Sequence, residues 1–219
     1  MILLDPDRLS RDRIPELAGQ MNQDNRVKAV LAGTSFLMCS DFSGFISALK
    51  AHLNKPLLIF PGNSTQLAPD ADGLLLLSLI SGRNPELLIG EHVRAAPHII
   101  RMGLACVPTA YILIESGRTT AVEYVSNTKP IPADKPDILA AHVMAADLMG
   151  FKAVYLEAGS GAENPVPQSM IAEARKHTRL PLMVGGGMRT QTAVEKALDA
   201  GADYVVVGTL LEQEGSLSI

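Results

Sequence analysis

Eight short apolar runs recur along this chain of 219 residues, and segments with helical spacing follow most of them. The runs that we expect to form strands are 1–4, 27–32, 56–60, 73–77, 106–114, 153–156, 181–184 and 203–207. The segments that we expect to form helices are 11–22, 41–53, 85–96, 134–149, 167–177 and 190–199. Near-continuous apolar runs are typical of buried parallel strands. Eight strands with crossovers in about 200–250 residues predict a TIM (β/α)8 barrel, with an open doubly wound sheet as the alternative.

Two parts of the pattern depart from an ideal barrel. Residues 61–72 are interrupted by proline and glycine, so we expect an irregular or shortened third helix there. Only residues 208–219 follow the last strand, which leaves a short C-terminal end. No linker is visible, so we expect a single domain over residues 1–219. The long polar segment 115–133 follows the fifth strand and would lie over the C-terminal face of a barrel, where active sites form.

The composition argues against several functional classes. The net charge is -4 at pH 7 and there is no basic run, so we expect no nucleic acid as a partner. Aromatic residues make up 4% of the chain, too few for a surface that stacks bases. No apolar stretch reaches the roughly 18 residues of a transmembrane helix. The cysteines, Cys39 and Cys106, fit thiols in a reducing compartment, and no signal segment opens the chain, so we expect a cytoplasmic protein.

Three glycine-containing turns follow late strands of the pattern. They contain Gly159 and Gly161, then Gly185, Gly186 and Gly187, and finally Gly208. A glycine has no Cβ, so backbone N–H groups can come close to a ligand there, and a helix that begins soon afterwards favours an anion. Loops after strands 7 and 8 of TIM barrels form a recurrent phosphate site. The turns therefore predict a phosphate-binding cup, to which Arg189 could add charge.

Asp5 ends the first strand, and Thr34 follows the second. In a barrel, both would lie at the C-terminal ends of neighbouring strands. One carboxylate and one hydroxyl could hold a Mg²⁺ that keeps most of its waters and takes further ligands from a phosphate. The other interpretation of Asp5 is an aspartate that caps a turn before proline. The pair alone leaves both interpretations open.

Glu157 follows Tyr155 by two residues, so alternation along the sixth strand places both side chains on one face. If that face lines the barrel mouth, the Glu157 carboxylate could accept a proton from a hydroxyl or hold a polyol by hydrogen bonds. The alternative is a buried structural glutamate that is paired with arginine or lysine. The neighbouring Gly159 and Gly161 favour a ligand site, because they allow close approach to the backbone.

Five longer motifs are spread over nearly the whole chain. They are Leu-Asp-Pro-Asp (4–7), Ser-Gly-Arg-Asn-Pro-Glu (81–86), Val-Glu-Tyr-Val-Ser-Asn-Thr (122–128), Tyr-Leu-Glu-Ala-Gly-Ser-Gly-Ala (155–162) and Val-Gly-Gly-Gly-Met-Arg (184–189). Together they resemble the geranylgeranylglyceryl phosphate synthase family, which includes the heptaprenylglyceryl phosphate synthases of bacilli. The second group of that family, with archaeal and bacterial members, is most similar. Most phosphate-binding barrels share the glycines but not the Tyr-Leu-Glu run.

The resemblance implies a TIM-barrel prenyltransferase that joins sn-glycerol 1-phosphate to a prenyl diphosphate. Geranylgeranyl diphosphate is the expected donor, and the product is an ether-linked precursor of phospholipids. Asp5 and Thr34 would hold the Mg²⁺ that binds the diphosphate, and Glu157 and Tyr155 are the implied catalytic residues. The residues implied to bind glycerol phosphate are Tyr155, Leu156, Glu157, Ala158, Gly159, Ser160, Gly161, Gly186, Gly187, Gly208 and Thr209. Family analogy also implies a homo-oligomer, a dimer or hexamer, and peripheral membrane contact for the lipid product.

Two positions depart from the family pattern. Leu3 stands where some members carry a lysine, which removes one cationic contact to phosphate, and Thr209 stands where asparagine is common. Two other functions fit the residues. One is another phosphosugar-binding TIM-barrel isomerase or synthase, and the other is a non-catalytic barrel that binds a phosphorylated ligand.

Overall fold

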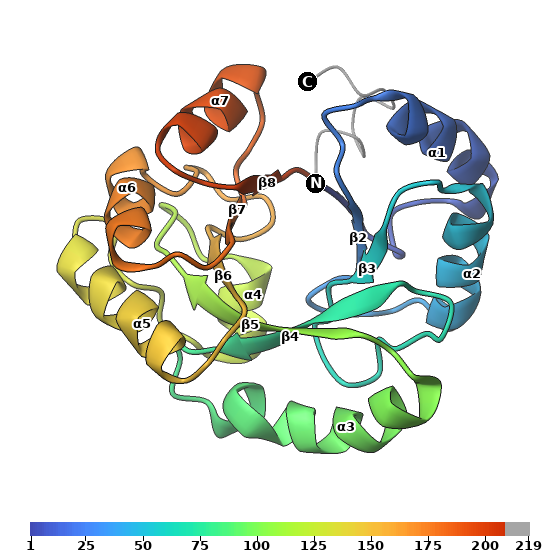
Figure 1. The fold of residues 1–219 in the computed structure, drawn as a ribbon, viewed down its shortest axis with the longest axis horizontal. Helices are drawn as coiled ribbons and strands as arrows, with labels where there is room; N and C mark the ends of the chain where they lie inside the picture. The colour runs from blue at the N-terminus through green and yellow to red at the C-terminus, as the bar shows by residue number, and fades with distance from the viewer. Residues whose placement is uncertain (209–219) are drawn as a thin grey trace. The chain divides into compact units, whose positions relative to one another are not determined.

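The structure, a computed structural model, describes residues 1–208. Its strands are β1 (Ile2–Leu4), β2 (Val30–Ala32), β3 (Leu57–Ile59), β4 (Gly73–Leu79), β5 (Cys106–Leu113), β6 (Ala153–Glu157), β7 (Leu182–Gly185) and β8 (Tyr204–Val206). They follow one another in the sheet in the order β1 to β8, with parallel pairing (Figure 1). This sequential order confirms the predicted TIM (β/α)8 fold. A doubly wound sheet would reverse its strand order at a switch point.

The chain divides into two compact units, which are described separately. The first unit comprises Met1–Leu76, Glu91–Cys106 and Gly208, and its described helices are the 3₁₀ turn η1 (Arg11–Arg13), α1 (Ile14–Gln23), α2 (Phe42–His52) and α3 (Glu91–Met102). The second unit comprises Leu77–Gly90 and Val107–Val207, and its helices are the π-helical turn η2 (Glu86–Gly90), α4 (Ala121–Ser126), α5 (Pro136–Leu148), α6 (Gln168–His177) and α7 (Gln191–Asp199).

In the first unit, α1 and α2 lie side by side (Figure 1). Helix α1 buries Ile14, Leu17 and Met21, which recur at the spacing of one helical face. Helix α2 begins at the N-cap residue Asp41, whose carboxylate accepts the amide N–H of Gly44 at 2.9 Å. These contacts fix the loops that follow β1 and β2, where the sequence places candidate site residues.

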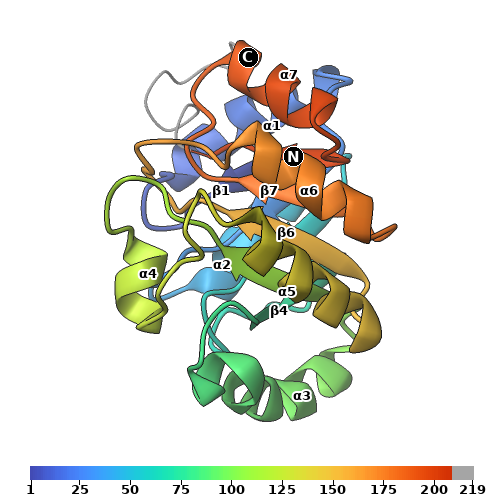
Figure 2. The same ribbon diagram turned by 90° about the vertical axis from the view of Figure 1, so that its left-hand side faces the viewer.

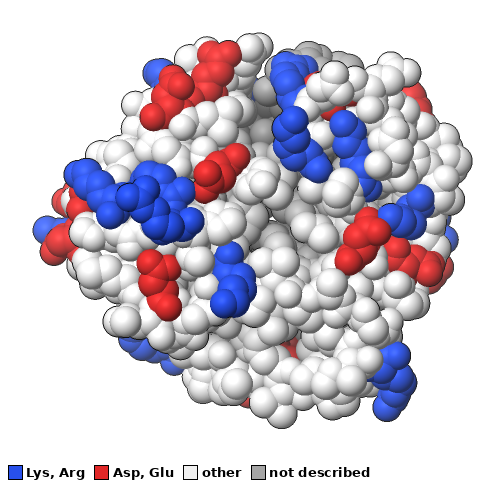
Figure 3. All heavy atoms as spheres, viewed as in Figure 1, with Lys and Arg blue, Asp and Glu red and all other residues white. Residues whose placement is uncertain are grey.

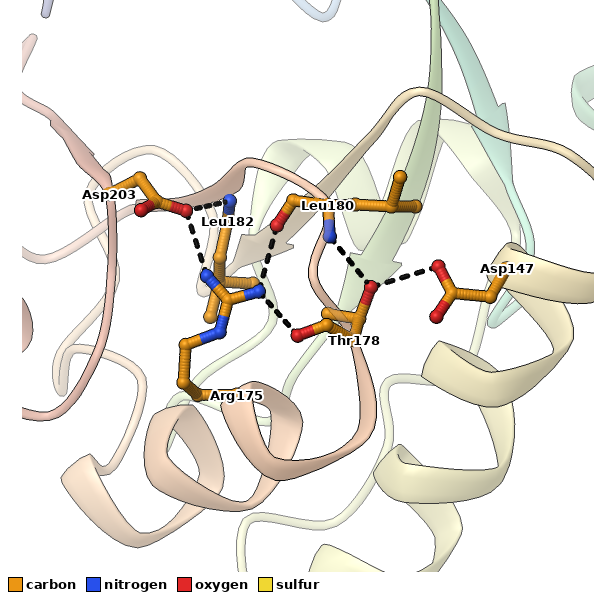
Figure 4. Close-up of polar contacts among 6 residues, drawn as sticks. All are labelled: Asp147, Arg175, Thr178, Leu180, Leu182 and Asp203. Carbon is orange, nitrogen blue, oxygen red and sulfur yellow. Dashed lines mark hydrogen bonds and ion pairs between the residues drawn. The ribbon is translucent and has the colours of Figure 1, made fainter.

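In the second unit, α5 and α6 pack against each other, and α7 follows α6 (Figure 2). A polar network joins the end of α6 to the N-terminal ends of β7 and β8 (Figure 4). The Nη2 of Arg175 donates to the carbonyl oxygens of Thr178 (2.6 Å) and Leu180 (2.9 Å), and its Nη1 forms a 2.9 Å ion pair with Asp203. Asp203 also accepts the amide N–H of Leu182 at 2.8 Å. The network therefore ties one helix to two strands at the end opposite the strand C-termini.

Three helical predictions need comment. Residues 60–72 form turns and bends rather than a helix, which confirms the irregular third connection. The predicted helix 85–96 begins as the π-helical turn η2 and continues as α3 to Met102, through Pro97. Proline usually ends a helix. Here Ala95 and Ile99 are buried on both sides of Pro97, and their burial holds the two halves in line. Helix α4 was not predicted, because its six residues are too few for a periodic signal.

Several surface properties can be stated for residues 1–208. None of their helices is both long and apolar enough to cross a bilayer, and the longest, α5, has 13 residues. Cys39 and Cys106 are free thiols. On the face shown in Figure 3, lysines and arginines lie in separate groups with acidic residues among them. Local pairing, rather than one charged stripe, therefore sets the electrostatics of that face.

Candidate active site

The second unit buries a carboxylate, Glu157, at the C-terminal end of β6, and only 5% of this residue is exposed. Pairing of β5 with β6 sets Tyr111 beside Tyr155, and the two rings stack with centroids 5.3 Å apart. The hydroxyl groups of both tyrosines favour the charged form of the Glu157 carboxylate, and the amide N–H of Gly159 donates to its Oε1 at 2.5 Å. Among the described residues, these partners are hydroxyls and an amide rather than arginine or lysine. The alternative of a salt-bridged structural glutamate is therefore wrong.

Burial governs the ionisation of this group. It raises the pKa of Glu157 from 4.5 to about 7, although the Gly159 amide and the hydroxyls of Tyr155 and Tyr111 favour the charged form and lower it. Burial and the nearby Glu157 charge raise the pKa of both tyrosines well above 10. A carboxyl with a pKa near neutrality is suited to accept a proton from a bound hydroxyl, whereas both tyrosines keep theirs.

Each glycine of the β7 turn faces a neighbouring group. A Cβ on Gly185 would lie 2.1 Å from the Tyr155 hydroxyl oxygen, and one on Gly186 would lie 2.5 Å from Glu157 Oε1. A Cβ on Gly187 would lie 2.9 Å from the amide nitrogen of Pro165. The sequence predicted this triplet as a phosphate cup. The structure adds a packing reason, because the glycines make room for the side chains of the site.

The remaining residues of the 155–162 motif have different surroundings. The side chains of Leu156 and Ala158 are apolar as well as buried, so only their backbone offers polar groups to a ligand. Ser160 is exposed, and a Cβ on Gly161 would meet open space. Arg189 extends from the next loop and its Nη2 donates to the Ala162 carbonyl oxygen at 2.6 Å. Arg189 therefore holds the two loops together.

The segment after β5, which the sequence predicted to lie over the C-terminal face of the barrel, comes close to the turn after β6. The amide N–H of Asn164 donates to the carbonyl oxygen of Ser116 at 3.0 Å. Thr120 lies so close to Gly159 that a Cβ on this glycine would be 2.5 Å from three Thr120 side-chain atoms. The β5 segment thus forms one wall beside Glu157.

The first unit brings Asp5 and Thr34 together. Thr34 Oγ1 donates to Asp5 Oδ2 at 3.0 Å, and both side chains are partly exposed. The other Asp5 oxygen accepts the amide N–H of Asp7, and the Nε of Arg8 lies 3.7 Å from Oδ2. Two oxygens about 3 Å apart match one edge of an octahedron around Mg²⁺, whose ligands lie at about 2.0–2.1 Å. The donor set therefore fits the predicted metal.

Gln66 completes this region, although its sequence context did not predict it. Its side chain is fully buried, its Oε1 accepts the Thr34 amide N–H at 3.1 Å and its Nε2 donates to the Thr34 carbonyl oxygen at 2.7 Å. Asp7, by contrast, accepts the amide N–H groups of Met38 and Cys39, so it fixes a loop. No sequence signal marks Gln66, because it lies in an irregular segment.

Two of the predicted phosphate residues follow β8. Gly208 lies in the first unit, where a Cβ would be 3.5 Å from the Leu3 carbonyl oxygen, an ordinary contact distance. Leu3 lies within β1, and its apolar side chain carries no charge for a phosphate. Thr209 lies outside the described residues.

The chain is similar to known proteins over nearly its whole length. A family model described as the PcrB family matches residues 1–219. A geranylgeranylglyceryl phosphate synthase from Spirosoma linguale is 42% identical over 216 residues, which cover 99% of this chain and 86% of that protein. One from Chitinophaga pinensis is 41% identical, with coverage of 99% and 85%. The solved (S)-3-O-geranylgeranylglyceryl phosphate synthase from Thermoplasma acidophilum, in complex with substrate sn-glycerol-1-phosphate, matches with 31% identity and a TM-score of 0.91, covering 97% of this chain and 85% of that chain.

Proposed function

The chain belongs to the PcrB family, and from this premise we propose that residues 1–219 form one prenyltransferase domain. It joins sn-glycerol 1-phosphate to a long-chain prenyl diphosphate, with geranylgeranyl diphosphate as the preferred donor. The product is a glyceryl phosphate ether, a precursor of ether phospholipids. The names of the Spirosoma and Chitinophaga relatives and the glycerol phosphate in the Thermoplasma structure support this proposal.

The observation that carries the proposal is the buried Glu157 carboxyl, whose pKa of about 7 suits a general base. In the reaction, the 3-hydroxyl oxygen of glycerol phosphate bonds to C1 of the prenyl chain. The C1–oxygen bond to diphosphate breaks, and the diphosphate leaves with its electron pair. Glu157 takes the hydroxyl proton, while the hydroxyls of Tyr155 and Tyr111 favour the charged carboxylate that accepts it.

Asp5 and Thr34 are the proposed ligands of Mg²⁺, because their oxygens lie at a suitable spacing and remain partly exposed. When bound, Mg²⁺ would neutralise charge on the departing diphosphate. Gln66 holds the Thr34 backbone from both sides, so the hydroxyl is presented in a fixed position. These residues form a binding site for the diphosphate end of the donor.

The loop after Thr34 offers an apolar surface for the start of the prenyl chain. Phe36 and Met38 are largely exposed there, although both are large and apolar. Asp7 fixes the backbone of this loop through the amide of Met38 at 2.9 Å. An exposed apolar loop beside a diphosphate site fits a donor with a charged head and an apolar tail, and it also offers peripheral contact with a membrane that receives the lipid product.

Glycerol phosphate would bind along residues 155–161. Tyr155 and Glu157 face its hydroxyl groups, and Ser160 and Gly161 offer an accessible hydroxyl and backbone N–H groups. Gly186 and Gly187, together with Gly208 and Thr209, are the proposed phosphate contacts.

Helix α5 supports self-association, as a dimer or hexamer. Beyond its buried face, this helix exposes further apolar side chains, and Leu148 is 89% exposed. An apolar hollow of about 320 Å³ adjoins it, lined in part by Ile80, Leu88 and Met149. A helix that is apolar on nearly all sides is usually covered by another surface, and we propose that a second copy covers this one.

The free thiols Cys39 and Cys106 fit a cytoplasmic location.

The test is incubation of the full chain with radiolabelled sn-glycerol 1-phosphate and prenyl diphosphates of several lengths, with and without EDTA. We expect a lipid-soluble labelled product that forms only with Mg²⁺ and most rapidly with the geranylgeranyl donor. Binding of glycerol phosphate without any product would favour a non-catalytic binding barrel. If no prenyl diphosphate gave a product and the protein turned over another phosphosugar, the result would favour an isomerase or synthase.

A further inference from the structure

The Thr120 hydroxyl has no hydrogen-bond partner among residues 1–208. Thr120 is the N-cap residue of α4, yet its side chain makes no capping hydrogen bond. A threonine at this position usually accepts an amide N–H of the first turn, which is worth about 1 kcal/mol. Thr120 is only 4% exposed, and its Oγ1 has no hydrogen-bond partner among residues 1–208. A buried hydroxyl without a partner costs about 1–3 kcal/mol, so the orientation needs an explanation.

The side chain is turned toward the candidate active site. Its Cβ, Cγ2 and Oγ1 all lie 2.5 Å from the point where a Cβ on Gly159 would be. The amide N–H of Gly159 binds Glu157 Oε1, so Thr120 borders the turn that carries the candidate base. The hydroxyl therefore does not cap the N-terminus of α4, and the side chain lies against the segment 155–161 instead.

We infer that Thr120 is a substrate-binding residue whose hydroxyl contacts an oxygen of the phosphorylated polyol bound along residues 155–161. A hydroxyl both donates and accepts, so it can bind either a polyol hydroxyl or a phosphate oxygen. This inference rests on the proposed function, because the polyol phosphate is the substrate proposed there. It also gives Gly159 a second role, since a side chain at that position would push Thr120 away.

The test is Thr120→Val, which replaces the hydroxyl with a methyl group of similar shape. Isothermal calorimetry with sn-glycerol 1-phosphate should show a dissociation constant raised about tenfold. The melting temperature should stay the same or rise, because no hydrogen bond within the protein is lost. Thr120→Ser should retain most of the affinity.

Thr109→Val is a matched control from the same unit. Thr109 is fully buried, but its Oγ1 donates to the Val107 carbonyl oxygen at 2.8 Å. This variant should melt at a lower temperature and bind sn-glycerol 1-phosphate as the wild type does. Thr120→Val should therefore lower the affinity without lowering the melting temperature, whereas Thr109→Val should lower the melting temperature without changing the affinity.

The results divide cleanly. If the wild type binds sn-glycerol 1-phosphate and Thr120→Val binds it equally well, the inference is overturned and the proposed function stands. A lower melting temperature for Thr120→Val with unchanged affinity would also overturn it, and would indicate a structural water on the hydroxyl. If the wild type gives no binding heat with sn-glycerol 1-phosphate, the proposed substrate is wrong, and the inference is overturned with it.

Discussion

The second unit holds two polar clusters, a buried one around Glu157 at the C-terminal ends of its strands and a more exposed one around Asp203 at the N-terminal ends. The two clusters differ in the groups that are paired with their carboxylates. At the N-terminal ends, Asp203 is bound by the guanidinium of Arg175 and by a backbone amide, and its side chain is 47% exposed. At the C-terminal ends, Glu157 is almost fully buried and accepts a backbone amide, and the hydroxyls of Tyr111 and Tyr155 favour its charged form. One carboxylate is neutralised by a cation, whereas the other has only neutral donors.

This difference separates stability from chemistry. A carboxylate paired with arginine stays charged and holds elements together. A buried carboxylate with only neutral partners is stabilised less in its charged form, so it can take up a proton near neutral pH. Changes at the two ends should therefore have opposite signatures, and the following predictions test that contrast.

Glu157→Gln should have the largest effect. It keeps the shape of the side chain and removes the base, so kcat should fall by about 10²–10⁴ in steady-state assays. The variant should be more stable than the wild type at pH 8 and similar at pH 4. Since folding raises the pKa of Glu157 from 4.5 to about 7, the wild type loses stability as pH rises through that range, and the glutamine does not.

Urea unfolding of both proteins between pH 4 and pH 8 measures this. The difference in the free energy of unfolding should grow with pH toward about 3 kcal/mol. A constant difference across the range would show that folding does not shift the pKa of Glu157, and full activity of the variant would remove it from the chemistry.

Arg175→Ala should destabilise the protein by about 2–4 kcal/mol, because the backbone carbonyls of Thr178 and Leu180 lose their donor. Kinetic constants of the folded enzyme should not change. Arg26→Ala is the control, because Arg26 forms an exposed pair with Asp24 and should contribute about 1 kcal/mol or less. Loss of activity in folded Arg175→Ala would contradict the separation of the two ends.

Tyr111→Phe should shift the pH dependence of kcat/KM. The Tyr111 hydroxyl favours the charged form of Glu157, so its removal raises the pKa of Glu157 further. The acid limb of the profile should move up by about one pH unit. Tyr124→Phe, at an exposed position of α4, should leave the profile unchanged. An identical profile for Tyr111→Phe would mean that Tyr111 only packs against Tyr155.

Asp147→Ala should have the smallest effect. Asp147 extends the Arg175 network by accepting the hydroxyl of Thr178 at 2.9 Å, but it is exposed (Figure 4). Its removal should cost about 0.5–1 kcal/mol by thermal unfolding. In a double-mutant cycle with Arg175→Ala, the two costs should not add, because both side chains bind Thr178. Strict additivity would show that the network acts as separate pairs.

Much of the fold could be predicted because apolar periodicity reports burial directly. The eight runs became eight strands in sequence order, and the irregular segment 61–72 stayed without a helix. The pairing of Tyr155 with Glu157 on one face followed from alternation within a single strand. These inferences need only local geometry.

The rest of the site depends on register and on contacts between distant loops. Tyr111 lay inside an apolar run, and its role depends on pairing with Tyr155 across two strands. A buried tyrosine hydroxyl usually needs a partner, which is the one signal that could have marked it. Gln66 binds the Thr34 backbone, and Thr120 lies against Gly159. Both contacts join loops that are distant in the sequence, so no residue spacing predicts them.

The glycine triplet has a consequence for how such a protein can change over time. A Cβ on Gly186 would lie 2.5 Å from the Glu157 carboxylate and 2.6 Å from the backbone nitrogen of Gly159, and the φ of +82° at Gly186 itself favours glycine; a Cβ on Gly185 would meet the Tyr155 hydroxyl. Substitution at this turn is therefore opposed by the protein's own backbone and side chains, whether or not a ligand is bound. A descendant that keeps this barrel but has alanine or serine at position 186 should have moved the turn after β6 together with the Glu157 carboxylate, so this one position would report a rebuilt site.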